Sequence, residues 1–134
     1  MLKWNKGFGA GIIGGIVFVI VSWIFSFLPG VADWYAQWFP MMMTTNGMVS
    51  MTVASFIIGL LMGLVYMVIN KGVPGKGWKK GFNYGFYVWL LAGLMWPIML
   101  MGFASVWVWF QELVFGLVTY AIVGMVVAVV FGRK

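Results

Sequence analysis

Residues 7–28 read GFGAGIIGGIVFVIVSWIFSFL, an unbroken run without a charged side chain. A helix needs about 20 residues to cross the hydrocarbon core of a bilayer, where no water can satisfy a broken backbone. Proline and glycine at positions 29 and 30 close the run. The sequence therefore predicts a transmembrane helix here.

Three further runs have the same apolar character. They cover about residues 49–69, 80–103 and 111–131. Within residues 80–103, Trp96-Pro97 predicts a kink, because proline leaves the carbonyl one turn earlier without its hydrogen-bond donor. The sequence predicts an all-α membrane protein, a bundle of four transmembrane helices that forms a single domain over residues 1–134.

The composition supports this fold class. Hydrophobic residues make up 64% of the 134 positions and charged residues 7%, whereas a soluble domain presents a surface of which about a quarter to a third is charged. We therefore expect the lipid bilayer to be the main environment and partner of the chain.

The basic residues mark one side of the predicted bundle. They precede the first span, connect the second to the third and follow the fourth: Lys3, Lys6, Lys71, Lys76, Lys79, Lys80, Arg133 and Lys134. By the positive-inside rule that side is cytoplasmic, which predicts a multi-pass protein of the cell (inner) membrane with both termini in the cytoplasm. The net charge of +6 is thus interpreted as a topology signal and not as a nucleic-acid surface.

The outer connection between the first two spans is rich in aromatic residues. Trp34, Tyr35, Trp38 and Phe39 favour the headgroup level, so residues 31–39 are predicted to form a short amphipathic helix in the interface, with Asp33 near its start. Trp107 and Trp109 are expected to form the matching belt beside the fourth span.

Methionines gather after this segment, at positions 41, 42, 43, 48 and 51. Thioether groups can bind a soft ion such as Cu(I). The alternative, a flexible apolar segment that fills the mouth of the bundle, needs no metal, and we predict no metal site.

Two parts of the chain share a pattern. Residues 6–11 and 80–85 both read KGFxxG, and Gly59-Leu60-Leu61 resembles Gly116-Leu117-Val118. These matches predict two tandem helical hairpins of equal orientation, related about the membrane normal. Chance similarity in a chain rich in glycine and phenylalanine is the alternative.

Glycines recur at four-residue spacing within the predicted spans. The candidate packing residues are Gly7, Gly11, Gly15, Gly59, Gly63, Gly81 and Gly85. Small residues at this spacing let two helix backbones approach closely in lipid, and Leu60 is expected on a lipid-facing side. A glycine-rich nucleotide loop would instead need a preceding strand.

The chain has neither cysteine nor histidine. It therefore lacks thiolate ligands, the usual haem and zinc ligand and the usual general base, so we predict no enzymatic activity and no cofactor. Charged residues at mid-depth of the spans are missing, which disfavours an ion-coupled pump. The hydroxyl and amide side chains within the spans are expected to bond to backbone or to neighbouring helices.

Glu112 and Asp33 are the two acidic residues of the chain, and both belong to the predicted outer side. We expect Glu112 in the first turn of the fourth span, where it would compensate the positive end of the helix dipole. The functional alternative is a cation or proton site at an outer vestibule that also involves Asp33 or Tyr35.

The runs FIIGLLMGLVY at 56–66 and KGFNYGFYVWL at 80–90, with Pro74-Gly75 between them, resemble small four-span prokaryotic membrane proteins of uncharacterised function. The resemblance implies a topology but no activity and no functional residue.

Together these features predict a non-enzymatic structural or accessory subunit. It would pack against itself, as a homo-oligomer, or against a larger membrane complex through its glycine-rich helix faces. The alternative is a small channel or transporter for a neutral or hydrophobic solute.

Overall fold

The computed structural model describes residues 2–27, 31–100, 102 and 106–133, and within these ranges the secondary structure is helical, without a strand. In chain order the elements are α1 (Trp4–Ser26), α2 (Val31–Trp38), η1 (Pro40–Met43), α3 (Thr45–Ile69), η2 (Asn70–Gly72), α4 (Trp78–Val88), η3 (Trp89–Gly93), α5 (Met95–Leu100) and α6 (Val106–Phe131). The all-α prediction is confirmed.

Among the described residues, three helices are long and apolar enough to cross a bilayer. These are α1, α3 with its continuation into η2, and α6. Each of them begins several residues before the predicted span, since α1 starts at Trp4, α3 at Thr45 and α6 at Val106.

The predicted third span, residues 80–103, includes positions 101 and 103 outside the described residues, and its described part is not one continuous helix. It is divided into α4, the π-helix η3 and the short helix α5, and in η3 the amide of Leu94 bonds to the carbonyl of Trp89 at 3.0 Å. Pro97 explains this interruption, because it has no N–H to donate to Gly93 four residues earlier and its ring clashes with that carbonyl. The break therefore begins before the proline and extends over a longer stretch than a simple kink.

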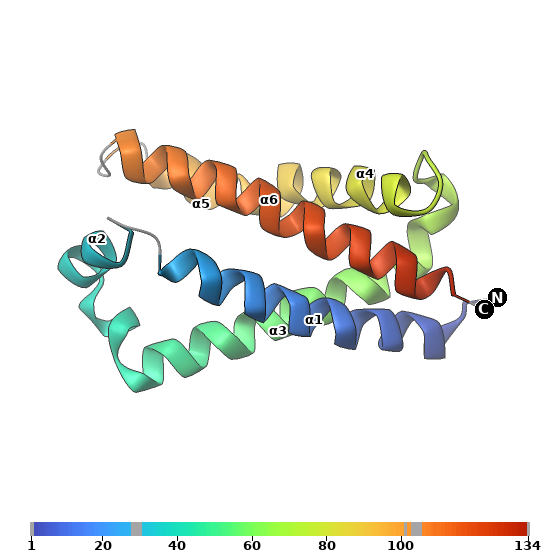
Figure 1. Cartoon of the computed structure of the whole chain (residues 1–134), viewed down its shortest axis with the longest axis horizontal. Helices are drawn as coiled ribbons and strands as arrows, with labels where there is room; N and C mark the ends of the chain where they lie inside the picture. The colour runs from blue at the N-terminus through green and yellow to red at the C-terminus, as the bar shows by residue number, and fades with distance from the viewer. Residues whose placement is uncertain (1, 28–30, 101, 103–105, 134) are drawn as a thin grey trace.

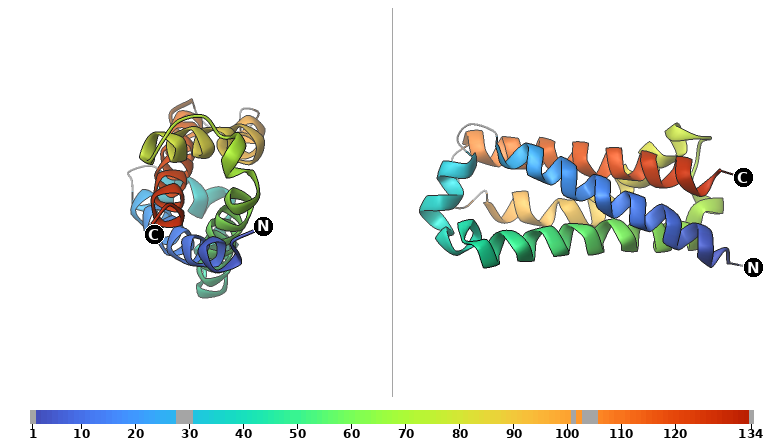
Figure 2. Two further views of the ribbon diagram at one scale, coloured as in Figure 1. Left: turned by 90° about the vertical axis from the view of Figure 1, so that its right-hand side faces the viewer. Right: turned by 60° about the horizontal axis from the view of Figure 1, so that its bottom comes forward.

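The helices α1, α3, α4, α5 and α6 run along the long axis of the molecule, and α2 lies across one end of it (Figure 1). α1 lies between α3 and α6, and α4 packs on α6 (Figure 2). The start of α1, the connection from η2 to α4 and the end of α6 lie at one end of the molecule, and α2 lies at the other. The basic residues of the described chain are thus collected at one end, opposite Asp33.

Glycines bring α1 and α3 into backbone contact. A Cβ atom on Gly11 would lie 2.5 Å from the carbonyl oxygen of Leu60, one on Gly15 would lie 2.7 Å from that of Phe56, and one on Gly63 would overlap the backbone of Gly11. Leu60 therefore lies in this interface, and its predicted lipid-facing position is wrong. Leu61, which is 50% exposed, lies on the exposed face of α3 instead.

A second glycine contact joins α4 to α6. A Cβ atom on Gly81 would overlap the carbonyl oxygen of Gly124, and one on Gly85 would overlap that of Tyr120. Gly63 and Gly124 therefore occupy equivalent places, since each meets both glycines of a KGFxxG sequence. The predicted alignment of Gly59 with Gly116 is displaced from this equivalence by about one helical turn.

The two contacts differ at the position one turn further along. Gly15 continues the close approach of α1 to α3, but the corresponding residue after Gly81 and Gly85 is Trp89, the first residue of η3. An indole side chain prevents two backbones from touching. The π-helix thus begins at the point where the glycine contact between α4 and α6 ends.

A neighbouring face of α1 packs on α6. Ala10, Gly14 and Phe18 are buried there, a Cβ atom on Gly14 would lie 2.7 Å from Cγ2 of Val127, and the ring of Phe18 meets that of Tyr120 edge-on at 5.4 Å. α1 therefore uses two different rows of small residues, one for each neighbouring helix.

The polar side chains within the helices bond mainly to carbonyl oxygens, as expected. Ser26 bonds to Trp23, Thr52 to Met48, Ser55 to Met51, Thr119 to Phe115 and Tyr84 to Met62, at 2.6–2.9 Å. The Tyr84 bond is the one of these that joins two helices, because it connects α4 to α3. Its side chain is 1% exposed.

Candidate functional site at the outer end

The short helix α2 covers the end of the bundle that lies opposite the basic residues (Figure 1). Tyr35 of α2 and Phe39 just after it pack with Val108 and Trp109 of α6. The predicted interfacial helix is thus present as an α-helix from Val31 to Trp38, and its aromatic side chains reach the start of α6.

Glu112 lies deeper in α6 than predicted. Because α6 begins at Val106, Glu112 belongs to the second helical turn, whereas a helix dipole acts within the first. The expected dipole compensation is therefore wrong as the main role of this carboxyl. Its partner is the side chain of Tyr35, which forms a hydrogen bond with it.

Gln111 is the second polar residue at this end, and it is only 6% exposed. Its Oε1 atom is buried and has no hydrogen-bond partner among the described residues. An unpaired buried acceptor costs about 1–3 kcal/mol. The amide oxygen is therefore free to accept a bond from a ligand.

The helical spacing places Gln111 about one turn after the contact that α6 makes with α2. Val108, Gln111 and Phe115 share one face of α6, since they are three and four residues apart. Val108 contacts α2, and the ring of Phe115 stacks on that of Phe25 of α1 at 4.5 Å. Gln111 thus lies between the contacts that α6 makes with α2 and with the end of α1.

A second unpaired group lies at the π-helix. The Nε1 atom of Trp89 is buried and has no hydrogen-bond partner in the described chain. A Cβ atom on Gly116 would lie 3.3 Å from this nitrogen, so the indole lies against the backbone of α6. The polar groups without partners are thus found along α6 and around the broken helix.

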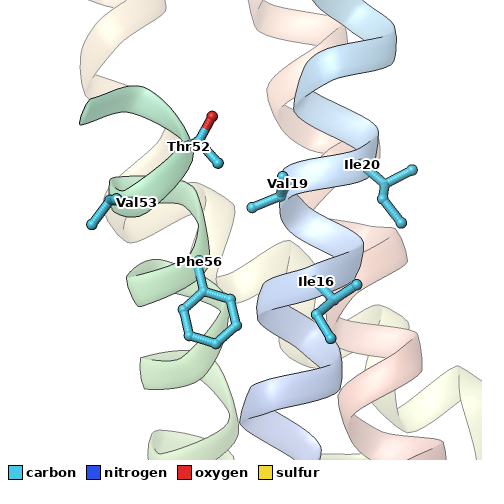
Figure 3. A pocket seen from close by; sticks show the side chains of 6 residues that line it. All are labelled: Ile16, Val19, Ile20, Thr52, Val53 and Phe56. Carbon is cyan, nitrogen blue, oxygen red and sulfur yellow. The ribbon is translucent and has the colours of Figure 1, made fainter. Parts of the chain in front are cut away.

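An apolar groove lies between α1 and α3 (Figure 3). It has a volume of about 370 Å³ and is lined by Ile16, Val19, Ile20, Thr52, Val53 and Phe56. The indole N–H of Trp23 donates to the hydroxyl of Thr52 at 3.0 Å beside it. This lining suits a hydrocarbon chain and offers no charged group.

The other predicted outer residues are separate from the Gln111–Glu112 pair. Asp33 is exposed on α2, so Tyr35 is the α2 side chain that meets Glu112. Trp107 is 61% exposed, but Trp109 packs beneath α2 and its Nε1 is buried, which contradicts the predicted belt position for Trp109. Met41 is 81% exposed, and within the described residues no group of three or more His, Cys, Asp or Glu side chains occurs.

Sequence reasoning missed Gln111 and Trp89. Gln111 was treated only as the start of an apolar run, although an amide three residues after Val108 and four before Phe115 lies on a predictably buried face. Trp89 could have been found from the repeat, since it replaces the glycine that the first KGFxxG helix has at position 15.

The structure is helical, and three of its described helices have the length and apolar composition of membrane-spanning helices. Comparison of the chain with known protein families, with curated proteins and with solved structures finds no match.

Proposed function

We propose that this protein is a non-enzymatic structural or accessory subunit of the cell membrane, built from four spans in two tandem hairpins. The observation that carries the proposal is the pair of glycine contacts, α1 with α3 and α4 with α6. Close backbone packing of this kind makes each helix pair a rigid unit in lipid. Such a unit is suited to hold partner helices in place.

The glycine faces hold the chain's own helices together, so a partner must bind elsewhere. We place the partner surface on η3 and α5, where the path of the proposed third span is broken. Leu91 is 88% exposed and Met95 67% exposed. These side chains are more exposed than Ile12 of α1, which is 46% exposed. A neighbouring helix from a second copy or a larger complex would cover them.

A photo-crosslinking experiment in native membranes tests this surface. With a photoreactive amino acid at Leu91, we expect a discrete adduct with a protein, either a second copy or another membrane subunit. The same group at Ile12 is the matched control and should react with lipid. Lipid adducts alone at both positions would contradict the accessory-subunit proposal.

The proposed topology has a separate test. A reporter that is active only outside the cytoplasm should be active when it is fused within residues 40–47 and inactive after Lys134. The reason is the distribution of basic residues, eight on one side of the proposed spans and none on the other. Activity after Lys134 would require an odd number of spans. This fusion is decisive because the proposed third span is divided into α4, η3 and α5.

A small channel or transporter for a neutral or hydrophobic solute is the second candidate. The buried nitrogen of Trp89 and the buried amide oxygen of Gln111 favour it, since both can bind a polar group along α6. Flux of a neutral solute into vesicles that contain the purified protein alone, reduced by Trp89→Phe, would move this function ahead of the first.

A further inference from the structure

The connection from α3 to α4 concentrates positive charge. Within residues 71–80, which we call the basic connection, the chain places half of its eight basic residues: Lys71, Lys76, Lys79 and Lys80. The first three are exposed and the fourth is half-buried. The acidic side chains of the whole sequence are Asp33 and Glu112, and both belong to the end of the molecule that α2 covers (Figure 1). These lysines are therefore not neutralised by a carboxylate side chain of the same chain.

The backbone of the basic connection is held in place by packing and hydrogen bonding. Val73 is buried in the main hydrophobic core and is 8% exposed. The side-chain amide of Asn83 in α4 donates to the carbonyl of Pro74 at 2.9 Å. Gly75 and Gly77 have φ angles of +101° and +59°, which glycine adopts without strain. Because the backbone that carries the lysines is fixed, less conformational entropy is lost when a ligand binds to them.

An exposed indole sets the level of this surface in the bilayer. Trp78 begins α4 and is 56% exposed, and Nζ of Lys79 lies 5.8 Å from the centre of its ring, within the range of a cation–π contact. Tryptophan side chains favour the headgroup level of a membrane. The basic connection also follows directly on α3 and η2, which are long and apolar enough to cross a bilayer. Its lysines are therefore expected at the depth of the lipid phosphates.

From the charge, the fixed backbone and the interfacial indole we propose that the basic connection binds the phosphate headgroup of an anionic phospholipid. Four or more lysines directly beside a transmembrane helix are typical of surfaces that attract anionic lipids, and an ammonium group forms charge-assisted hydrogen bonds with phosphate oxygens. A soluble polyanion fits less well, because Trp78 and the apolar helix α3 hold the surface against the bilayer. The inference depends on the apolar character of α3 and goes beyond the accessory-subunit proposal.

The test uses the full-length purified protein in a neutral detergent. Phosphatidylglycerol and phosphatidylcholine with the same acyl chains are added in equal amounts, and native mass spectrometry counts the lipids that the protein retains. We expect phosphatidylglycerol to be retained in preference, and the preference to fall with added salt, because salt screens exposed charges. Phosphatidylglycerol should also raise the melting temperature more than phosphatidylcholine does, since a ligand that binds the folded state stabilises it.

Two double variants locate the surface. Lys76→Gln combined with Lys79→Gln removes two exposed charges and should weaken phosphatidylglycerol binding by about fivefold for each lysine. Lys3→Gln combined with Lys6→Gln is the matched control, since it removes the same charge from the same end of the molecule but lies outside the basic connection. Its effect on phosphatidylglycerol binding should be several times smaller.

Three results would overturn the proposal. The first is equal retention of the two lipids by the wild type. The second is an equal loss of binding in the two double variants, because the charge of the whole end would then be responsible. The third is tighter binding of a DNA oligonucleotide than of phosphatidylglycerol, which would assign the surface to a soluble polyanion.

Two further points keep the test decisive. If Lys76→Gln with Lys79→Gln lowers the melting temperature without lipid, Lys71→Gln combined with Lys76→Gln replaces it. The purified protein and lipid are sufficient here, whereas the crosslink at Leu91 needs native membranes, so failure of one proposal is distinguishable from failure of the other.

Discussion

Gly11→Leu is expected to abolish the folded state of the first helix pair. A Cβ atom at this position would lie 2.5 Å from the carbonyl oxygen and 3.1 Å from the Cα atom of Leu60. Backbone atoms cannot rotate away, so α1 and α3 must separate, at a cost of about 3 kcal/mol or more. Gly63→Leu, on the other side of the same contact, should have the same effect. The measurement is the yield of monodisperse protein and its melting temperature in detergent.

Gly9→Leu is the matched control for Gly11→Leu. It lies two residues away in the same helix, and a Cβ atom there would meet nothing within 4 Å. Because leucine has a higher helix propensity than glycine by about 1 kcal/mol, this variant should be as stable as the wild type or more so. Equal losses from Gly9→Leu and Gly11→Leu would show that glycine removal as such, and not helix contact, is responsible.

Gly124→Leu is the second change with a large expected effect. The carbonyl of Gly81 and the backbone of Gly85 occupy the space that a side chain at position 124 would need, with Cα of Gly85 at 2.8 Å from the Cβ position. We expect α4 to separate from α6, again at about 3 kcal/mol or more, and the segment from η2 to α5 to become sensitive to protease.

The proposed tandem arrangement predicts a difference between the two glycine variants. If each hairpin is a unit held by its own contact, Gly124→Leu should leave α1 and α3 protected while α4 is cleaved. Val129→Leu, which enlarges a side chain that is 40% exposed on the same helix α6, should change neither pattern. Equal cleavage of both halves in Gly124→Leu would contradict two separately stabilised hairpins.

The division of residues 78–100 into α4, η3 and α5 shows where prediction from local sequence stops. Pro97 indicated an interruption, but the proline alone does not predict that the α-helix changes to a π-helix from Trp89 onward. That depends on which residue follows Gly85 by one turn and on whether α6 can approach it. A tryptophan at that place ends the backbone contact. The repeat marks this position in the sequence, but the approach of α6 to it is a property of the tertiary structure.

The positions of Leu60 and Glu112 illustrate the same limit. Leu60 is apolar and next to Gly59, so its sequence is compatible with either side of the helix, and the side was decided by the contact with Gly11. Glu112 was expected near a helix start because the apolar run begins there, but α6 extends back to Val106, and Val108 and Trp109 of this extension pack with Tyr35 and Phe39. Its partner, Tyr35, comes from a segment far away in the chain.

The sequence by itself determined the helical class, the apolar runs, a short helix within residues 31–39 and the collection of basic residues in three places, because each depends on local composition and periodicity. The tertiary structure decided which glycines face each other, where α4 ends, and that the Oε1 atom of Gln111 is buried without a hydrogen-bond partner among the described residues. These features depend on the relative rotation and register of helices that are distant in the chain. In an apolar environment many rotations bury similar side chains, so close backbone packing, and not hydrophobicity, selects among them.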